Sequence, residues 1–189
     1  LSDSLSAVTS VRDTLTEGYS DALAVPNLPE STGTTPKQDL QMQSGLAAHT
    51  FMSLAHDALY IFRTTPLTAL RSGGIATKDV DQLAEFLAVP LNEACLLIEV
   101  LYHAGLITLT TSLQWEVTTK YEAWRKKSKE SQWVALAQAW LDLPLMGSEG
   151  NKPLSGTGES PTVGVMRWQT LCTLRWWNEN TDTPPTKHW

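Results

Sequence analysis

The sequence predicts a mainly α-helical protein in which a winged-helix module, a helix-turn-helix followed by a short β-hairpin, is embedded in an otherwise all-helical domain. Three observations predict this class. Apolar residues recur at helical spacing through most of the chain. A glycine pair at 73–74 separates two helical segments, and residues 106–118 alternate apolar and polar side chains as a β-hairpin does. Three short helices followed by a hairpin is the winged-helix arrangement.

The composition is that of an ordinary globular protein with an acidic balance. Of its 189 residues 42% are hydrophobic and 18% charged, which excludes wholesale disorder. A net charge of −6 excludes a protein that wraps nucleic acid along its whole surface. Cys95 and Cys172 each lie in an apolar helical stretch, which predicts two buried thiols in a reducing compartment. The sequence shows no signal-peptide pattern and no apolar run near the ~20 residues that span a bilayer, so we expect a cytoplasmic protein without a membrane partner.

Residues 1–35 form the first predicted region, an N-terminal helix and a proline-rich linker. Apolar residues recur at helical spacing between residues 4 and 19, which predicts an amphipathic helix. Prolines and a glycine then interrupt the pattern at 25–36 and predict the linker. The chain begins without a methionine and ends soon after a predicted helix, so we expect it to belong to a larger protein.

Residues 36–120 form the second region, a long helix followed by the winged-helix module. Thr35 is a suitable N-cap for a helix over 36–63, which Gly45 weakens and can divide. Residues 66–72, which begin with a proline, are predicted to make about one and a half helical turns before the glycine pair.

Two further helices complete the predicted module. Thr77 is the expected N-cap of a helix over 78–88, whose first turn carries aspartates where the helix dipole favours negative charge. Pro90 opens a third helix that runs to about His103, and Gly105 ends it before the hairpin.

Residues 121–189 form the third region, a tryptophan-rich helical extension. The pattern predicts a short helix, a polar break at 126–129, a helix over 131–143 and a last helix over 164–178. Glycine, serine and proline are frequent at 144–163 and predict a long mobile loop. The tryptophans at helical spacing are predicted to lie in the core: Trp133, Trp140, Trp168 and Trp176.

An ordered series of motifs lies between residues 43 and 143. These are "PLTALRSGGIATKDVDQLAEFLAV", then "NEACLLIEVLYHAGLI", then "YEAW", then "QWVALAQAWLDLP". The series resembles a bacterial family of helicase-associated, or helicase C-terminal domain, proteins, which are related to the accessory region of XPB-like DNA-repair helicases. The resemblance implies a winged-helix module in a larger protein linked to DNA helicases. Beside the glycine pair this chain carries Arg71 and Lys78, where the family often carries more arginine, and both are candidate nucleic-acid contacts.

The predicted third helix, 91–103, is the element that enters the major groove of DNA in a winged helix. Its apolar residues extend almost all the way round. The side away from the expected core carries no lysine or arginine; it carries Asn92, Leu96, Glu99 and His103. We therefore expect this helix to be buried on two sides, against helix 36–63 or helix 131–143, rather than to read bases.

A basic cluster near the polar break is the other candidate for nucleic-acid contact. Its members are Lys120, Arg125, Lys126, Lys127 and Lys129, against the single acid Glu122. Tyr121 and Trp124 interleave with them, and basic charge beside aromatic rings suits single strands and duplex backbone. The alternative is a solvated turn whose aromatic rings are buried and whose lysines keep the chain soluble.

The sequence carries no pattern for catalysis or metal binding. The glycine-rich stretch 147–158 lacks the Gly-Lys-Ser/Thr of a nucleotide-hydrolysing phosphate loop. His49 and His56 share a helical face, but zinc needs three or four ligands, so we expect partly buried structural histidines. Cys95 lies in the most apolar helix and is expected to be an inert thiol. We expect no enzyme activity, no cofactor, no metal and no small-molecule substrate.

Two functions remain open from the sequence. The first is a non-catalytic winged-helix domain of a helicase-associated, DNA-repair-linked protein that contacts DNA through the local basic cluster. The alternative is a scaffold that binds other domains of the parent protein or separate protein partners and has no affinity for DNA.

Overall fold

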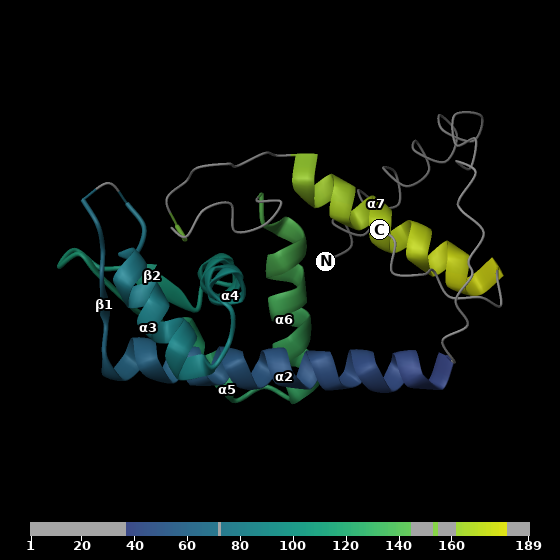
Figure 1. Cartoon of the computed structure of the whole chain (residues 1–189), viewed down its shortest axis with the longest axis horizontal. Helices are drawn as coiled ribbons and strands as arrows, with labels where there is room; N and C mark the ends of the chain where they lie inside the picture. The colour runs from purple at the N-terminus through teal and green to yellow at the C-terminus, as the bar shows by residue number, and fades with distance from the viewer. Residues whose placement is uncertain (1–36, 72, 145–152, 155–161, 181–189) are drawn as a thin grey trace. The chain divides into compact units, whose positions relative to one another are not determined.

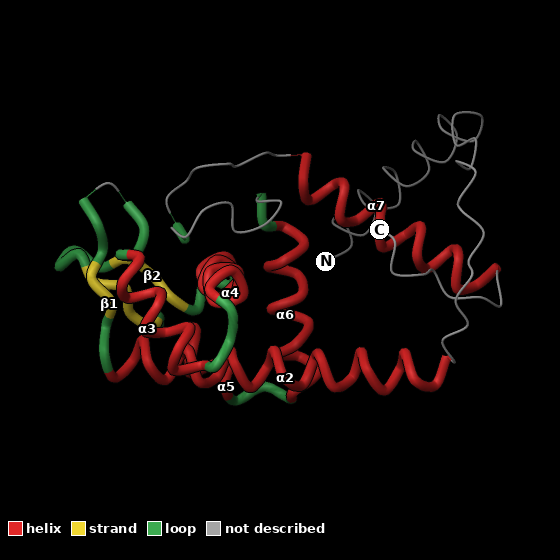
Figure 2. The backbone as a smooth tube through the Cα atoms, in the orientation of Figure 1, coloured by secondary structure: helices red, strands yellow, loops and turns green. Residues whose placement is uncertain are grey.

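A computed structural model describes residues 37–71, 73–144, 153–154 and 162–180. Within them the protein is mostly helical, with a small antiparallel sheet (Figures 1 and 2). The elements in chain order are α2 (Lys37–Thr64), β1 (Leu67–Thr68), α3 (Thr77–Leu87), α4 (Leu91–His103), β2 (Ile107–Leu109), β3 (Gln114–Val117), α5 (Thr119–Arg125), α6 (Lys129–Asp142) and α7 (Thr162–Asn180). The helix predicted over 4–19 and the linker 25–36 lie outside the described residues. Of the predicted loop 144–163, the structure describes only residues 144, 153–154 and 162–163.

Among the described residues, the predicted hairpin and the predicted helices are present with small shifts of their ends, except for the helical turns predicted at 66–72. α2 runs without interruption through Gly45, around which a Cβ would meet nothing within 4 Å. The predicted N-cap at Thr77 is wrong: α3 begins at Thr77, and the N-cap position belongs to Ala76, which makes no side-chain cap. α3 ends where Ala88 adopts a left-handed conformation, and α4 follows Pro90 directly. None of the helices in the described part of the chain is long and apolar enough to cross a membrane.

The prediction of helical turns at 66–72 is wrong, because Leu67 and Thr68 form strand β1. The sheet has the order β1-β3-β2, and Leu67 pairs with Trp115 of β3 in an antiparallel register. Leu67 buries its side chain while Thr68 faces out, so the strand gains an apolar contact and ladder hydrogen bonds that an isolated helical turn lacks. The glycine pair then reverses the chain with positive φ angles of 87° and 78°, which side-chain-bearing residues rarely adopt.

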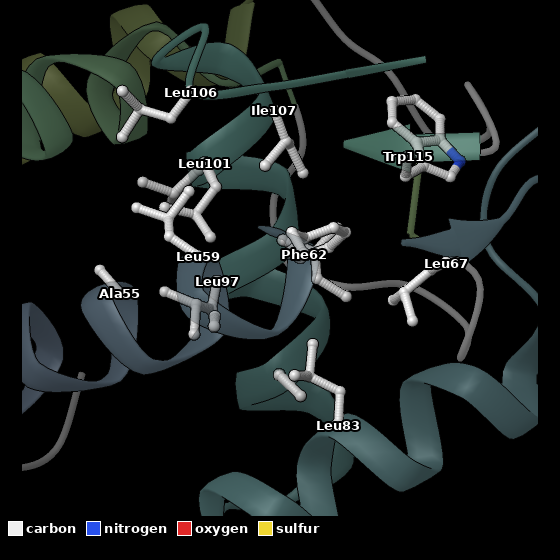
Figure 3. Packing of buried hydrophobic residues seen from close by; sticks show 14 of the residues in the cluster. Ala55, Leu59, Phe62, Leu67, Leu83, Leu97, Leu101, Leu106, Ile107 and Trp115 are labelled. Atoms are coloured by element: carbon white, nitrogen blue, oxygen red, sulfur yellow. The ribbon is translucent and has the colours of Figure 1, made fainter. Parts of the chain in front are cut away.

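One hydrophobic core joins α2, α3, α4 and the sheet. Figure 3 shows their side chains pointing toward a shared interior, with Phe62 of α2 near its middle. Phe62, Leu59, Ile98 and Leu101 are fully buried, and Trp115 of β3 is nearly so. The indole N–H of Trp115 donates to the carbonyl of Gly74 at 3.2 Å, which fixes the glycine turn against the sheet.

The predicted burial of the tryptophans and of Cys172 is wrong in part. Trp133 is 37% exposed, Trp168 is 58% exposed, and Cys172 of α7 is also exposed, while Trp140 is half-buried. The side chain of Trp176 lies outside the described residues. α6 buries a face made by Gln132, Leu136 and Ala139. Each tryptophan of this helix lies one position after a residue of that face and so points away from the centre of the contact. Helical spacing thus identified a stripe but not which stripe faces the core.

Candidate functional site

Helix α4 is packed on two sides, as its sequence predicts. It contacts α3 and α2 on one flank and α6 on another. Ala94, Cys95, Ile98 and Leu101 are fully buried, and so is Val100. The expectation that Glu99 lies on the open side is wrong, because its side chain is 6% exposed and accepts a hydrogen bond from the backbone N–H of Leu154. α4 therefore presents no continuous exposed face to a DNA groove.

The turn between α5 and α6 is held by a buried glutamine. The Gln132 amide donates to the carbonyls of Arg125 and Lys127, at 3.1 and 2.9 Å, and these are backbone groups at the end of α5. Its oxygen lies 2.8 Å from Nε2 of His56 in α2. Ser128 caps α6 by accepting from the backbone N–H of Ser131. The turn is thus tied to α2 and has a defined conformation.

Four basic residues, which we call the basic turn, project from this turn: Arg125, Lys126, Lys127 and Lys129. All four are exposed. Arg125 is paired with Glu122 at 3.1 Å, so its charge is largely compensated. Glu122 also lies 3.9 Å from Arg63, a basic residue at the end of α2 that the sequence analysis missed because only the fold brings it to α5.

The other predicted nucleic-acid contacts do not join the basic turn. The Lys120 side chain lies over Gly105, where a Cβ would be 3.0 Å from its Nζ. Arg71 lies in the loop that follows β1, whereas the basic turn follows α5, which contacts the end of α2 through the Glu122–Arg63 pair. Lys78 is exposed on the first turn of α3. The predicted residues are therefore divided among four places: the basic turn, Lys120 beside Gly105, the loop after β1 and the first turn of α3.

The aromatic rings within the cluster are buried. Tyr121 and Trp124 are 7% and 4% exposed. The Trp124 ring lies against the ring of His56, with centroids 4.8 Å apart, and its N–H donates to the carbonyl of Gln132. Neither ring is therefore available to stack on a base. Buried rings are what the second prediction for this cluster, a solvated turn, requires. His56 is a partly buried structural histidine as predicted, while His49 is exposed, contrary to prediction.

The predicted inert thiol, Cys95, is fully buried in α4. Burial, with a smaller contribution from Glu99 and Asp81, raises the pKa of the Cys95 thiol to about 11. The thiol is therefore protonated near neutral pH and is a poor nucleophile, as predicted. Across the described ranges, no three His, Cys, Asp or Glu side chains gather in a way that would hold a metal ion.

An open apolar groove lies along the first half of α2 and reaches α4. Its volume is about 430 Å³, and its lining includes Leu46, Ala47, Thr50, Phe51, Leu54 and Glu93. Leu46 is 66% exposed, while Phe51 and Leu54 are half-buried. We call this feature the α2 groove. The groove could not be predicted from the sequence, because a helical stripe alone does not reveal which part of a long helix lacks a neighbour.

No family model, curated protein or solved structure matches this chain.

Proposed function

We propose that this chain is a non-catalytic winged-helix domain that serves as a protein-interaction scaffold. The order α3, α4, β2, β3 supports the winged helix, since it places two helices and a turn before a hairpin. The short strand β1 before α3, paired beside β3, adds the third strand of such a sheet. The ordered motifs between residues 43 and 143 support a parent protein of the helicase-associated kind.

The burial of α4 is the observation that carries the scaffold function. A winged helix that reads DNA presents polar side chains of its third helix to base edges. Here α6 covers one flank of α4 and the remaining core covers another, while the exposed residues include Glu93, whose charge opposes phosphate. A helix that is packed in this way positions its neighbours rather than a nucleic acid.

Contact with nucleic acid is the second candidate function, and the basic turn is the observation that favours it. Lys126, Lys127 and Lys129 are exposed and lie within four positions of one another in the chain. Such a cluster would bind phosphates without reading sequence. The buried rings of Tyr121 and Trp124 remove the stacking platform that single-strand binding uses.

Fluorescence anisotropy with labelled single-stranded, duplex and forked DNA across a salt series tests the choice. The scaffold function predicts no salt-dependent binding even near ~50 mM salt, where phosphate contacts are strong. Salt-dependent binding that the Lys126→Glu/Lys127→Glu variant loses would replace the scaffold with the second candidate. Arg71→Glu/Lys78→Glu makes the same change in net charge at the two predicted contacts beside the glycine pair, so a loss of binding in that variant alone would place the binding there and not at the basic turn.

A further inference from the structure

One peptide group in the connection between α6 and α7 is hydrogen-bonded on both of its edges. It joins Pro153 to Leu154, two described residues of that connection. The Pro153 carbonyl accepts from the backbone N–H of Ile75 at 3.3 Å, and the Leu154 N–H donates to the Glu99 carboxylate at 2.5 Å. We call the Ile75 N–H and the Glu99 carboxylate together the peptide clamp.

Both halves of the peptide clamp belong to the core and not to the connection that occupies it. Ile75 is fully buried and follows the glycine turn, whose Gly74 carbonyl accepts from the indole N–H of Trp115. Glu99 is 6% exposed on α4. Because a buried carboxylate is costly unless N–H groups bond to it, the clamp favours a ligand that brings such a donor. Its preformed geometry also means that little conformational entropy is lost on its side when a ligand binds.

The two residues in the clamp indicate which ligand chemistry it accepts. Pro153 is buried, and proline has no N–H that burial would leave without a partner. Leu154 supplies the N–H that Glu99 accepts, and its side chain packs against the core. The ligand that suits the clamp is therefore a proline followed by an apolar residue that is not itself a proline.

The internal segment is held in a strained conformation. Leu154 has a φ angle of 62°, in the left-handed region that residues with a side chain rarely adopt. Both clamp bonds are made by the peptide group that precedes this angle, so the bonds do not require it. Strain of this kind is concentrated at ligand clamps and switch regions. Here it weakens the internal segment relative to a separate segment that makes the same two bonds without a left-handed residue.

We propose that the peptide clamp binds a proline-apolar segment of a partner protein, and that Pro153–Leu154 occupies the clamp as an internal ligand until such a segment displaces it. The partner segment places its proline beside the glycine turn and donates the next N–H to Glu99. The internal segment is tethered, so it competes at a high effective concentration and keeps the clamp closed to weak ligands. The proposal rests on the scaffold function and deepens it, because it gives the chemistry by which a partner docks.

Fluorescence anisotropy of a labelled peptide with the sequence of residues 149–158, EGNKPLSGTG, tests the clamp in the full chain. Leu154→Pro removes the internal N–H and cannot adopt the φ angle of Leu154, so it opens the clamp. Leu154→Ala keeps the N–H and removes the apolar contact. We expect the peptide to bind the Leu154→Pro chain most tightly, the Leu154→Ala chain less tightly and the wild-type chain least. Circular dichroism shows whether each chain is folded, and Leu154→Ala carries the comparison with wild type if Leu154→Pro is not.

Two controls locate the binding at the clamp. A peptide with N-methylleucine at the position of Leu154 keeps the apolar side chain and lacks the N–H, so its dissociation constant is expected to rise at least about 10-fold, the effect of losing a hydrogen bond to a charged group. Glu99→Leu, added to either variant, removes the carboxylate and is expected to weaken binding by a similar factor. Wild-type binding as tight as that of the variants, no binding by the folded variants, or binding that either control leaves unchanged overturns the proposal. Salt-dependent DNA binding through the basic turn would instead overturn the scaffold function, whether or not the peptide binds.

Discussion

At the scale of single residues, Gln132 determines the geometry of the candidate site more than the lysines do. It is a buried polar side chain whose amide satisfies two carbonyls at the end of α5 and contacts His56 across the helix packing. Buried amides of this kind are stabilising only while all their partners are present. The turn that carries the lysines owes its conformation to this network.

Gln132→Ala is therefore expected to lower the free energy of unfolding by about 1–3 kcal/mol, because it leaves two carbonyls and one imidazole nitrogen without their protein partner. Urea denaturation followed by circular dichroism measures the change. Gln138→Ala is the matched control, since Gln138 lies on the exposed side of α6 and bonds only to the Asp142 carboxylate. Its expected effect is within about 0.5 kcal/mol. Equal midpoints for the two variants would show that the buried network does not stabilise the turn.

Some features of this site could be predicted from the sequence residue by residue, and others could not. The run of lysines at 126–129 is local, so reading the chain identified it and its exposure. The position of Arg63 and the burial of Trp124 depend on α2 crossing α5, and no local pattern records that crossing. A basic run interleaved with aromatic residues thus predicts charge correctly and ring accessibility poorly.

At the scale of elements, helices were predictable because their signals are local. Apolar spacing, Pro90 and the glycine after α4 give the positions of α3 and α4 to within one or two residues. Strand β1 was missed because its two residues become a strand only by pairing with β3, far along the chain. The stripes of α6 and α7 were found, but which stripe is buried depends on neighbours that the periodicity does not specify.

Replacing Gly45 of α2 or Gly164 of α7 with alanine is expected to change the free energy of unfolding in opposite directions. Gly45 of α2 has open space around it, so Gly45→Ala is expected to raise the free energy of unfolding by about 0.5–1 kcal/mol through helix propensity. At Gly164 of α7 a Cβ would lie 2.9 Å from the carbonyl oxygen of Leu141, a backbone atom of α6. Gly164→Ala is therefore expected to cost about 1–3 kcal/mol of α7 docking, despite the same gain in propensity.

Hydrogen exchange measured by mass spectrometry separates these two effects. Gly164→Ala is expected to speed exchange in α7 and to leave α3 and α4 unchanged, because only the α6–α7 contact is disturbed. Gly45→Ala is expected to slow exchange in the first half of α2. Unchanged protection of α7 in Gly164→Ala would show that α7 does not rest on α6 through this close approach.

At the scale of the whole molecule, α6 completes the fold and α7 is added to it. α6 covers α4, contributes Leu136 and Ala139 to the core, and supplies the glutamine that holds α5. α7 touches α6 at its first turn and leaves the following residues exposed. The predicted boundary at residue 121 separates α5 and α6 from the module, although both helices pack into the same core.

This hierarchy predicts different outcomes for two truncations. A chain ending at Pro161 loses α7 but keeps Leu154, whose N–H satisfies the buried Glu99, and it is expected to unfold in one cooperative transition. A chain ending at Ser128 loses α6 as well, which exposes one side of α4 and removes the Gln132 partners of His56 and Trp124. It is expected to bind a hydrophobic dye and to melt without a sharp transition, while keeping much of its helical signal. Thermal melts followed by near- and far-ultraviolet circular dichroism measure both chains. If the shorter chain melts as sharply as the longer one, α4 is stable without α6 packed against it. The burial of α4 by α6 would then no longer support the scaffold function over DNA binding.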